Sequence, residues 1–106
     1  MMSFNRVTLT GKVANAPRHA YRPDGSRVVE FSLELDEPGD LPGRRSRSLI
    51  PIVAIGALVD RSAGLLQKDQ LLLVEGRLNQ RRWQTPEGKQ RTVIEVIAAD
   101  LRSVKE

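Results

Sequence analysis

The sequence predicts an all-β fold: a five-stranded Greek-key barrel with one short helix between its third and fourth strands. Several segments place apolar residues at every second position, which is the period of a strand with one buried face. One segment, residues 57–69, changes to helical spacing, and turns built on proline and glycine separate the others. This is the element order of an OB-fold. We expect it to form a single domain over residues 1–106.

The first two strands are expected at residues 5–13 and 27–35. In the first, Val7, Leu9 and Val13 alternate with polar residues, and Gly11 interrupts the pattern as a bulge or sharp bend would require. The second has one apolar face, formed by Val29, Phe31, Leu33 and Leu35. Between them, "YRPDGSR" predicts a hairpin turn, because proline presets φ and glycine accepts positive φ.

Residues 48–56, "SLIPIVAIG", predict a third strand that is buried on most of both faces, since the run is nearly all apolar. Pro51 lacks a backbone donor, which indicates an edge or a bulge. The helix follows at residues 57–69, with Leu58, Leu65 and Leu66 on one face. Gly64 predicts that this helix is short.

The fourth and fifth strands are expected at residues 71–83 and 91–100, joined by a "TPEG" turn. We expect Leu72, Val74 and Leu78 to point inward. If the fourth strand has no bulge, Trp83 is out of phase with these three and projects from the polar face near the hairpin tip.

Composition excludes several classes of protein. The 106 residues include no cysteine, so disulfides and thiolate chemistry are excluded, and no run reaches the roughly 20 apolar residues of a membrane span. The N-terminus lacks the order of a secretory signal, so we expect a cytoplasmic protein. His19 is the only histidine and has too few companion ligands for a metal site. We therefore expect no cofactor, no metal and no enzymatic activity.

The balance of charge points to an anionic partner. Lysine and arginine total 17 against 13 acidic residues, a net charge of +4. The only tryptophan, Trp83, lies among Arg81, Arg82, Lys89 and Arg91. An exposed indole can stack on an unpaired base while the cations neutralise phosphates. The alternative is that arginine stems pack on Trp83 and shield it.

Ordered motifs add a family resemblance. They are "NRVTLTG" (5–11), "YRPDG" (21–25), "VVEFSL" (28–33), "IGALVD" (55–60), "VEGRL" (74–78) and "RRW" (81–83). Together they resemble the bacterial single-stranded DNA-binding proteins. The resemblance implies an OB-fold and non-catalytic, sequence-tolerant binding of single-stranded DNA in replication, repair and recombination. It also implies a nucleoid-associated homo-oligomer, typically a tetramer.

The chain also departs from that family. Two of its stacking positions fall at Leu49 and Ile55, which leaves Trp83 as the clear stacking residue. The chain ends at "LRSVKE" without the family's Pro/Gly-rich, acidic-tipped tail, so we do not expect it to recruit replication or repair proteins in the usual way. These features are similar to the primosomal replication protein N branch, whose members are tail-less dimers. Dimer and tetramer both remain open.

The candidate DNA-binding residues are mostly basic. Three alternatives stand beside this role: the 44–47 cluster is a solvated loop, Arg6 and Lys12 face a subunit interface, and Tyr21 caps the barrel rim. Phe4 is expected at an interface. The full candidate set is Arg6, Lys12, Tyr21, Arg22, Arg44, Arg45, Arg47, Arg77, Arg81, Arg82, Trp83, Lys89 and Arg91.

Two other functions compete with single-stranded DNA binding. The small number of aromatic residues, 4% of the chain, favours an adaptor that acts mainly through a replication, repair or plasmid protein. An RNA-binding barrel would use the same chemistry. Neither alternative involves a membrane.

Overall fold

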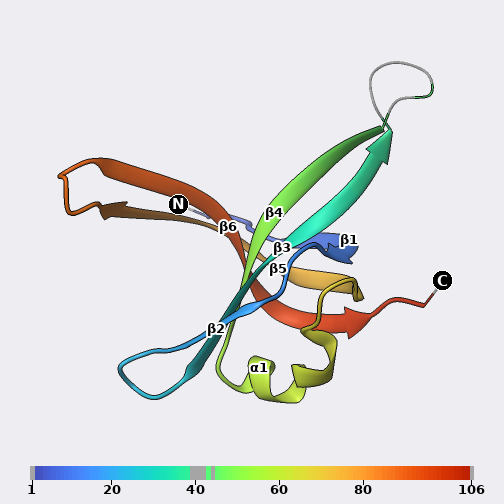
Figure 1. Ribbon diagram of the computed structural model, residues 1–106, viewed down its shortest axis with the longest axis horizontal. Coiled ribbons are helices and arrows are strands. Elements are labelled where there is room, and N and C mark those ends of the chain that lie inside the picture. Colours follow the sequence, from blue (N-terminus) through green and yellow to red (C-terminus); the bar gives the residue numbers. More distant parts are fainter. Residues whose placement is uncertain (1, 39–42, 44, 106) are drawn as a thin grey trace.

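The structure is a computed structural model in which residues 2–38, 43 and 45–105 are described. Six strands form one sheet in the order β1-β5-β6-β4-β3-β2, and an additional pairing of β1 with β3 closes five of them into a barrel (Figure 1). The elements are β1 (Val7–Val13), β2 (Arg18–Tyr21), β3 (Arg27–Pro38), β4 (Arg45–Ile55), α1 (Ala57–Arg61), a 3-10 helix (Ala63–Leu65), β5 (Leu71–Gln84) and β6 (Gln90–Ser103). The helical segment therefore lies between the third and fourth barrel strands, as the OB-fold prediction requires.

The strand β2 is one more than the sequence predicted. It pairs antiparallel with the start of β3, on the same edge that β1 uses further along. All four residues of β2 are exposed, so no alternation of apolar side chains marks it in the sequence. The predicted turn joins β2 to β3: Gly25 has a φ of 89°, and its amide donates to the Arg22 carbonyl at 2.8 Å.

The break at Gly11 marks the place where β1 changes partner. β1 pairs with β5 along Val7–Lys12 and reaches β3 at Lys12 and Val13. A side chain at Gly11 would collide with the backbone carbonyl of Glu34 on β3. Glycine is therefore needed because two strands approach closely, and the predicted sharp bend is confirmed.

A bulge also occurs between β5 and β6, but the extra residue belongs to β6. Glu75 lies opposite Asp100 and Gly76 opposite Ala98, which leaves Ala99 without a partner on β5. Because β5 has no insertion, its residues keep their alternation from the barrel into the hairpin. The condition on which the orientation of Trp83 depended is therefore met.

The barrel core includes six of the ten alternating strand positions that the sequence predicted, and Val7, Leu9 and Leu35 are partly buried against it. Leu58 and Val59 of α1 and Leu66 after the 3-10 helix join it, and α1 packs against β3, β4 and β6. The helical segment breaks after one turn, as Gly64 predicted. The strand residues of the core are Val13, Val29, Phe31, Leu33, Ile52, Ala54, Leu72, Val74, Val96, Ala98 and Leu101.

The predicted burial of Leu78 is wrong, and Leu49 is an exception to the burial predicted for most of residues 48–56, for one physical reason. Leu78, expected inward, is 48% exposed, and Leu49 in β4 is 53% exposed. The β3–β4 and β5–β6 hairpins extend beyond the barrel, so their side chains pass the point where the core can cover them (Figure 1). Periodicity identifies the face of a strand but not where the opposing layer ends.

Pro51 occupies a place where β3 needs no donor from β4. It lies opposite Ser32, whose amide donates to Asn15 Oδ1 at 3.0 Å and whose carbonyl accepts from the Ala14 amide at 2.9 Å. Pairing of β4 with β6 begins one residue later, at Ile52. The absence of an N–H at Pro51 therefore breaks no hydrogen bond between β3 and β4. Proline is tolerated in a sheet at positions of this kind.

Candidate nucleic-acid interface

The predicted β5–β6 hairpin carries the tryptophan. Its turn is closed by the Thr85 amide donating to the Lys89 carbonyl at 2.8 Å and by Gly88, whose φ is 85°. Trp83 lies directly opposite Arg91, one residue before the last pair of the ladder. A tight turn on a continuous ladder thus holds an indole and a guanidinium on one face of the hairpin.

The indole of Trp83 is partly exposed to solvent and partly covered by Arg81. Trp83 is 43% exposed, and the Arg81 guanidinium lies over its ring with Cζ 4.8 Å from the centroid. The prediction that Trp83 projects from the polar face is confirmed. The shielding alternative also describes part of the geometry, because Arg81 makes a cation–π contact with the ring. The remaining surface is available for contact with a base.

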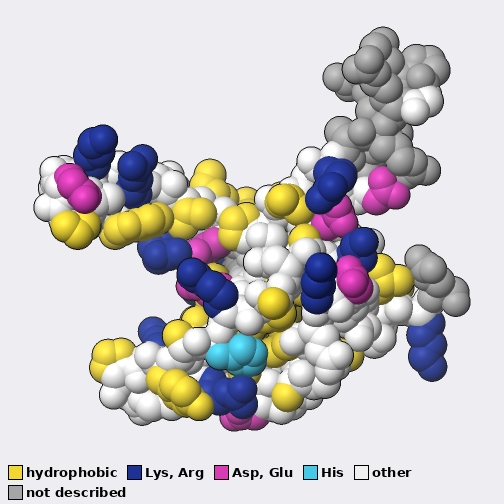
Figure 2. All heavy atoms as spheres, in the orientation of Figure 1, with side chains coloured by type: hydrophobic (Ala, Val, Ile, Leu, Met, Phe, Trp, Pro, Cys, Tyr) yellow, Lys and Arg dark blue, Asp and Glu magenta, His cyan; other side chains and the backbone are white. Residues whose placement is uncertain are grey.

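A groove lies beside this face. Figure 2 shows a hollow between two arms of the molecule, which Figure 1 identifies as the β5–β6 and β2–β3 hairpins. The groove has a volume of about 290 Å³. Its lining comes from the β1–β2 connection and from β2, β3, β4, β5 and β6, and comprises Asn15, Arg18, Glu30, Phe31, Ser32, Pro51, Ile52, Val53, Arg81, Val93 and Glu95. Segments distant in the sequence therefore meet here.

Two ion pairs line the groove. Arg18 Nη2 donates to Glu30 Oε2 at 2.9 Å, and Arg81 Nε donates to Glu95 Oε1 at 3.4 Å. Each carboxylate is thereby matched by a guanidinium. Arg18 is largely exposed and Arg81 about half exposed, so both cations remain within reach of solvent.

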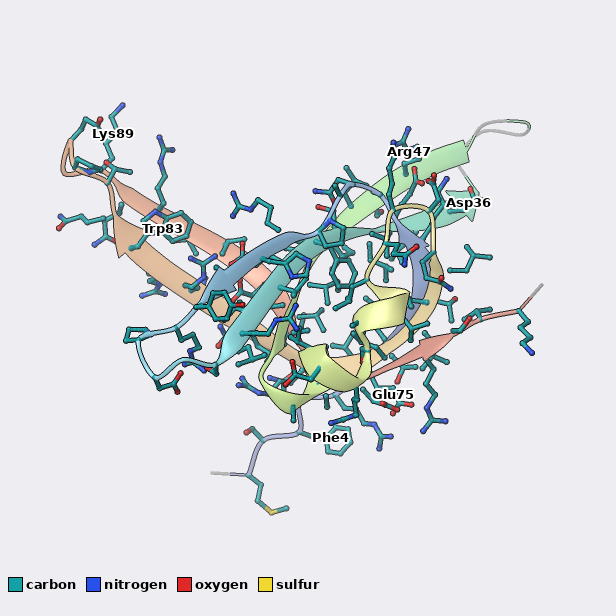
Figure 3. All side chains as sticks on the ribbon, turned by 60° about the horizontal axis from the view of Figure 1, so that its bottom comes forward. Phe4, Asp36, Arg47, Glu75, Trp83 and Lys89 are labelled. Atoms are coloured by element: carbon teal, nitrogen blue, oxygen red, sulfur yellow. The ribbon has the colours of Figure 1, made fainter. Side chains whose placement is uncertain are left out.

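The other cations of the predicted cluster do not share this face. Arg82 lies on the opposite face of β5, where its Nη2 donates to Gln80 Oε1 at 3.1 Å. Lys89 lies in the turn at the hairpin tip, beyond Trp83 (Figure 3). The run of cations in the sequence is therefore divided by the strand into two faces and a tip.

Lys12 and Arg47 form a separate cluster at the base of the β3–β4 hairpin. Both make ion pairs with Glu34, Lys12 at 3.5 Å, and Lys12 also lies 4.0 Å from Asp69. They line a second cavity with Asp36, at the end of the molecule away from Trp83 (Figure 3). These two cations are partly neutralised by neighbouring acids.

Arg6 and Arg77 line the same cavity beside the β-bulge. Arg6 Nη2 lies 3.4 Å from Glu75 Oε2, and both arginines line a shallow cavity that includes Gly76 and Ala99. Arg77 is also exposed. This pair is separate from the groove beside Trp83.

Tyr21 and Arg22 lie at the tip of the β2–β3 hairpin, and Tyr21 is 73% exposed. The hydroxyl and amide of Ser26 hydrogen-bond Asp24 Oδ1, which lowers the pKa of that carboxyl below its usual value. Arg44 lies outside the described residues, as does the side chain of Arg45, although its backbone begins β4.

Sequence reasoning missed the residues on the far side of the groove. Asn15 precedes β2 and Arg18 is its first residue, and because this exposed strand has no alternation, no pattern pointed to either residue. Glu95 was also missed, since a single glutamate between apolar neighbours reads as the solvent-facing side of a strand. Cross-strand pairing with Asn79 is the feature that places it on the Trp83 face.

No helix within the described ranges combines the length and apolar character needed to cross a bilayer.

Asp100 and Arg102 form a further ion pair, with the Arg102 Nε donating to Asp100 Oδ2 at 2.7 Å near the end of β6. The hydrogen bond from Arg102 lowers the pKa of Asp100 below its ordinary value.

Comparison with known proteins identifies the family. The model of the single-strand binding protein family matches residues 4–104. The chain is 32% identical to a single-stranded DNA-binding protein of Thermotoga maritima, over 96% of this chain and 74% of that protein, and 30% identical to one of Aquifex aeolicus, over 95% and 70%. It also superimposes on a Plasmodium falciparum SSB solved in complex with ssDNA, with a TM-score of 0.84, 25% identity and coverage of 99% and 98%. The predicted OB-fold and the predicted resemblance are both confirmed, and the chain belongs to the single-strand binding protein family.

Proposed function

We propose that this chain binds single-stranded DNA without catalysis, by stacking bases on Trp83 and neutralising phosphates with the surrounding arginines. The observation that carries the proposal is the half-exposed indole of Trp83, which lies opposite Arg91 and under Arg81 beside the groove. Such a protein serves DNA replication, repair and recombination. We place it in the cytoplasm, associated with the nucleoid.

The chemistry of this face favours an unpaired strand. Stacking needs the flat surface of a base, which a duplex hides, and it tolerates any base because every base has one. Guanidinium groups on either side neutralise the backbone and release its counterions. We propose Arg81 and Arg91 as the phosphate contacts nearest the indole and Arg18 as a contact across the groove.

The remaining candidates have secondary roles in this proposal. Tyr21 and Arg22 can extend the path of the strand along the β2–β3 hairpin, and Lys89 along the hairpin tip. Arg6, Arg77, Lys12 and Arg47 lie away from the groove and are engaged by, or close to, acidic side chains. We therefore propose that they add general attraction rather than specific contacts.

The opposite face of the β5–β6 hairpin favours a protein contact. Leu78 and Ile94 are 48% and 60% exposed there, on the side away from Trp83. Proteins of the family are typically homo-oligomers, so another copy of this chain is the partner that we propose for this face. Light scattering on the protein with Ile94→Glu tests it: a lower oligomeric mass supports the contact, and an unchanged mass contradicts it.

Titration with nucleic acid tests the proposed function. Since Trp83 is the only tryptophan, its fluorescence reports directly on the site. We expect oligo-dT to quench it, with an affinity that falls as salt rises, and a duplex of equal length to bind much more weakly. Matched oligo-U distinguishes DNA from RNA. Failure of oligo-dT and oligo-U to bind, together with retention of a protein partner after nuclease treatment, would favour the adaptor function instead.

A further inference from the structure

Glu95 is the feature of the nucleic-acid face that the proposed function does not use. Its exposed fraction is 4%, and among the described residues it is the only charged side chain that is buried. A carboxylate is a poor choice beside a phosphate backbone, and burying it is costly unless it is well partnered. Its position therefore calls for a physical reason.

The partners of Glu95 connect it to the indole. Oε2 accepts from Asn79 Nδ2 at 3.2 Å, and Oε1 accepts from Arg81 Nε at 3.4 Å. Arg81 in turn lies over Trp83 at 4.8 Å. Asn79, Arg81 and Trp83 follow one another at every second position of β5, and Glu95 lies opposite Asn79. A buried anion, a cation and the aromatic ring thus form one continuous contact along this face.

The geometry points to Glu95 as a positioning residue for the stacking site, an inference that rests on the proposed function. Glu95 engages only the Nε edge of Arg81. Within the described part of the chain, the two terminal guanidinium nitrogens of Arg81 make no hydrogen bond or ion pair with another residue. Held in this way, Arg81 supports one side of the indole and presents its terminal nitrogens to a phosphate. Without Glu95 the long arginine side chain would be free to leave the ring.

A positioning role for Glu95 and simple electrostatic attraction predict opposite changes in DNA affinity when the charge of Glu95 is removed. Glu95→Gln removes a negative charge from a DNA-binding face, so attraction to the backbone alone would strengthen binding. If Glu95 positions Arg81 and Trp83, the same substitution weakens binding despite the gain in net charge. We expect a loss of about two- to fivefold in affinity for oligo-dT, the size of one exposed cation–π contact.

Glu75→Gln is the matched control. Glu75 belongs to the same strand as Arg81 and pairs with Arg6 at 3.4 Å, beside a cavity that is separate from the groove and from the Arg81–Trp83 contact. The substitution removes the same charge, so unchanged or tighter binding is expected. A similar loss in both variants would mean that removing a carboxylate from this sheet weakens binding in general, and would overturn the specific role of Glu95.

The fluorescence of the free protein gives a readout that does not depend on DNA. We expect Glu95→Gln to raise the acrylamide quenching of Trp83 and lower its anisotropy, while Glu75→Gln leaves both unchanged. Unchanged indole accessibility in a folded Glu95→Gln protein would overturn the positioning role. A wild-type protein that fails to bind oligo-dT would overturn the proposed function instead, so the two failures are distinguishable.

Arg81→Met covers the case in which Glu95→Gln does not fold, and a double-mutant cycle applies where both variants fold. Arg81→Met changes a half-exposed side chain and removes the same contacts from the other end. It should reproduce the increased quenching and the weaker binding. Where both variants fold, adding Glu95→Gln to Arg81→Met should cause no further loss, because Glu95 acts through Arg81. Additive losses, or normal indole accessibility in Arg81→Met, would contradict the proposal.

Discussion

Asn5 and Leu78 are joined by two hydrogen bonds of 2.8 Å, in which Asn5 Nδ2 donates to the Leu78 carbonyl and Asn5 Oδ1 accepts from its amide. The Asn5 side-chain amide offers the same donor and acceptor as a peptide group. It therefore continues the pairing of β1 with β5 beyond Val7 and Gly76. We expect Asn5→Ala to lower the free energy of unfolding by about 1–2 kcal/mol, from two bonds of roughly 0.5–1.5 kcal/mol each at an exposed site. Urea denaturation measures the change. Gln67→Ala, which removes an exposed side chain without such bonds, should leave stability unchanged.

Gly76 is expected to be intolerant of any side chain. A Cβ there would collide with the Ile97 carbonyl and lie 3.0 Å from Ala98 Cα, and neither backbone atom can move without disturbing the bulge. We expect Gly76→Ala to destabilise the fold by about 1–3 kcal/mol through overpacking. The thermal midpoint checks this. Gly64 has no atom within 4 Å of the added Cβ, so Gly64→Ala should be neutral or slightly stabilising. Equal effects of the two substitutions would contradict the argument.

The orientation of Trp83 could be predicted because it depends only on local alternation. β5 contains no insertion, so the alternation of its two faces is unbroken from Val74, which faces the core, to Trp83, which faces away from it. The same alternation placed Leu78 on the core side and was correct about the face. Its exposure depends on where the barrel ends, which is set by the lengths of the other strands and is invisible in residues 71–83.

The groove could not be predicted because it arises between distant segments. Arg18 and Arg81 belong to β2 and β5, and they meet only because closure of the barrel brings the two hairpins together. β2 itself has no apolar face, and it forms through hydrogen bonding with β3 around a turn that the sequence did indicate. Local motifs therefore identified the turn and the tryptophan, but not the surface they share.

The salt dependence of binding should separate groove arginines from distant ones. Arg18 and Arg91 lie on the proposed path of the strand, whereas Arg102 pairs with Asp100 near the end of β6. We expect Arg18→Gln and Arg91→Gln each to reduce the slope of log K against log salt by about 0.7, the value for one phosphate of a single strand. Arg102→Gln should leave the slope unchanged. If all three lower it equally, the attraction is diffuse and the groove has no special part.

The β2–β3 turn should weaken in acid. The hydrogen bonds from Ser26 lower the folded-state pKa of Asp24 below its ordinary value of 3.8. A depressed carboxyl pKa contributes stability above the unfolded pKa, and this contribution is lost as pH falls through the folded pKa. Asp24→Asn should therefore be less stable than wild type at neutral pH, and the difference should shrink in acid. Urea denaturation of Asp24→Asn and of the wild type, at neutral pH and again in acid, measures this difference in stability. A difference that grows in acid would contradict it.

Trp83→Ala is the most direct test of stacking. The substitution removes a half-exposed ring on the groove side of the hairpin, so we expect binding of single-stranded DNA to weaken by about 1–3 kcal/mol. Anisotropy of a labelled oligo-dT measures the affinity, because the intrinsic probe is lost. Ile94→Ala truncates an exposed apolar side chain on the opposite face of the same hairpin and should leave binding near wild type, provided that light scattering shows the same oligomeric mass. Wild-type affinity in Trp83→Ala would mean that bases do not contact the indole, and that the arginines alone hold the strand.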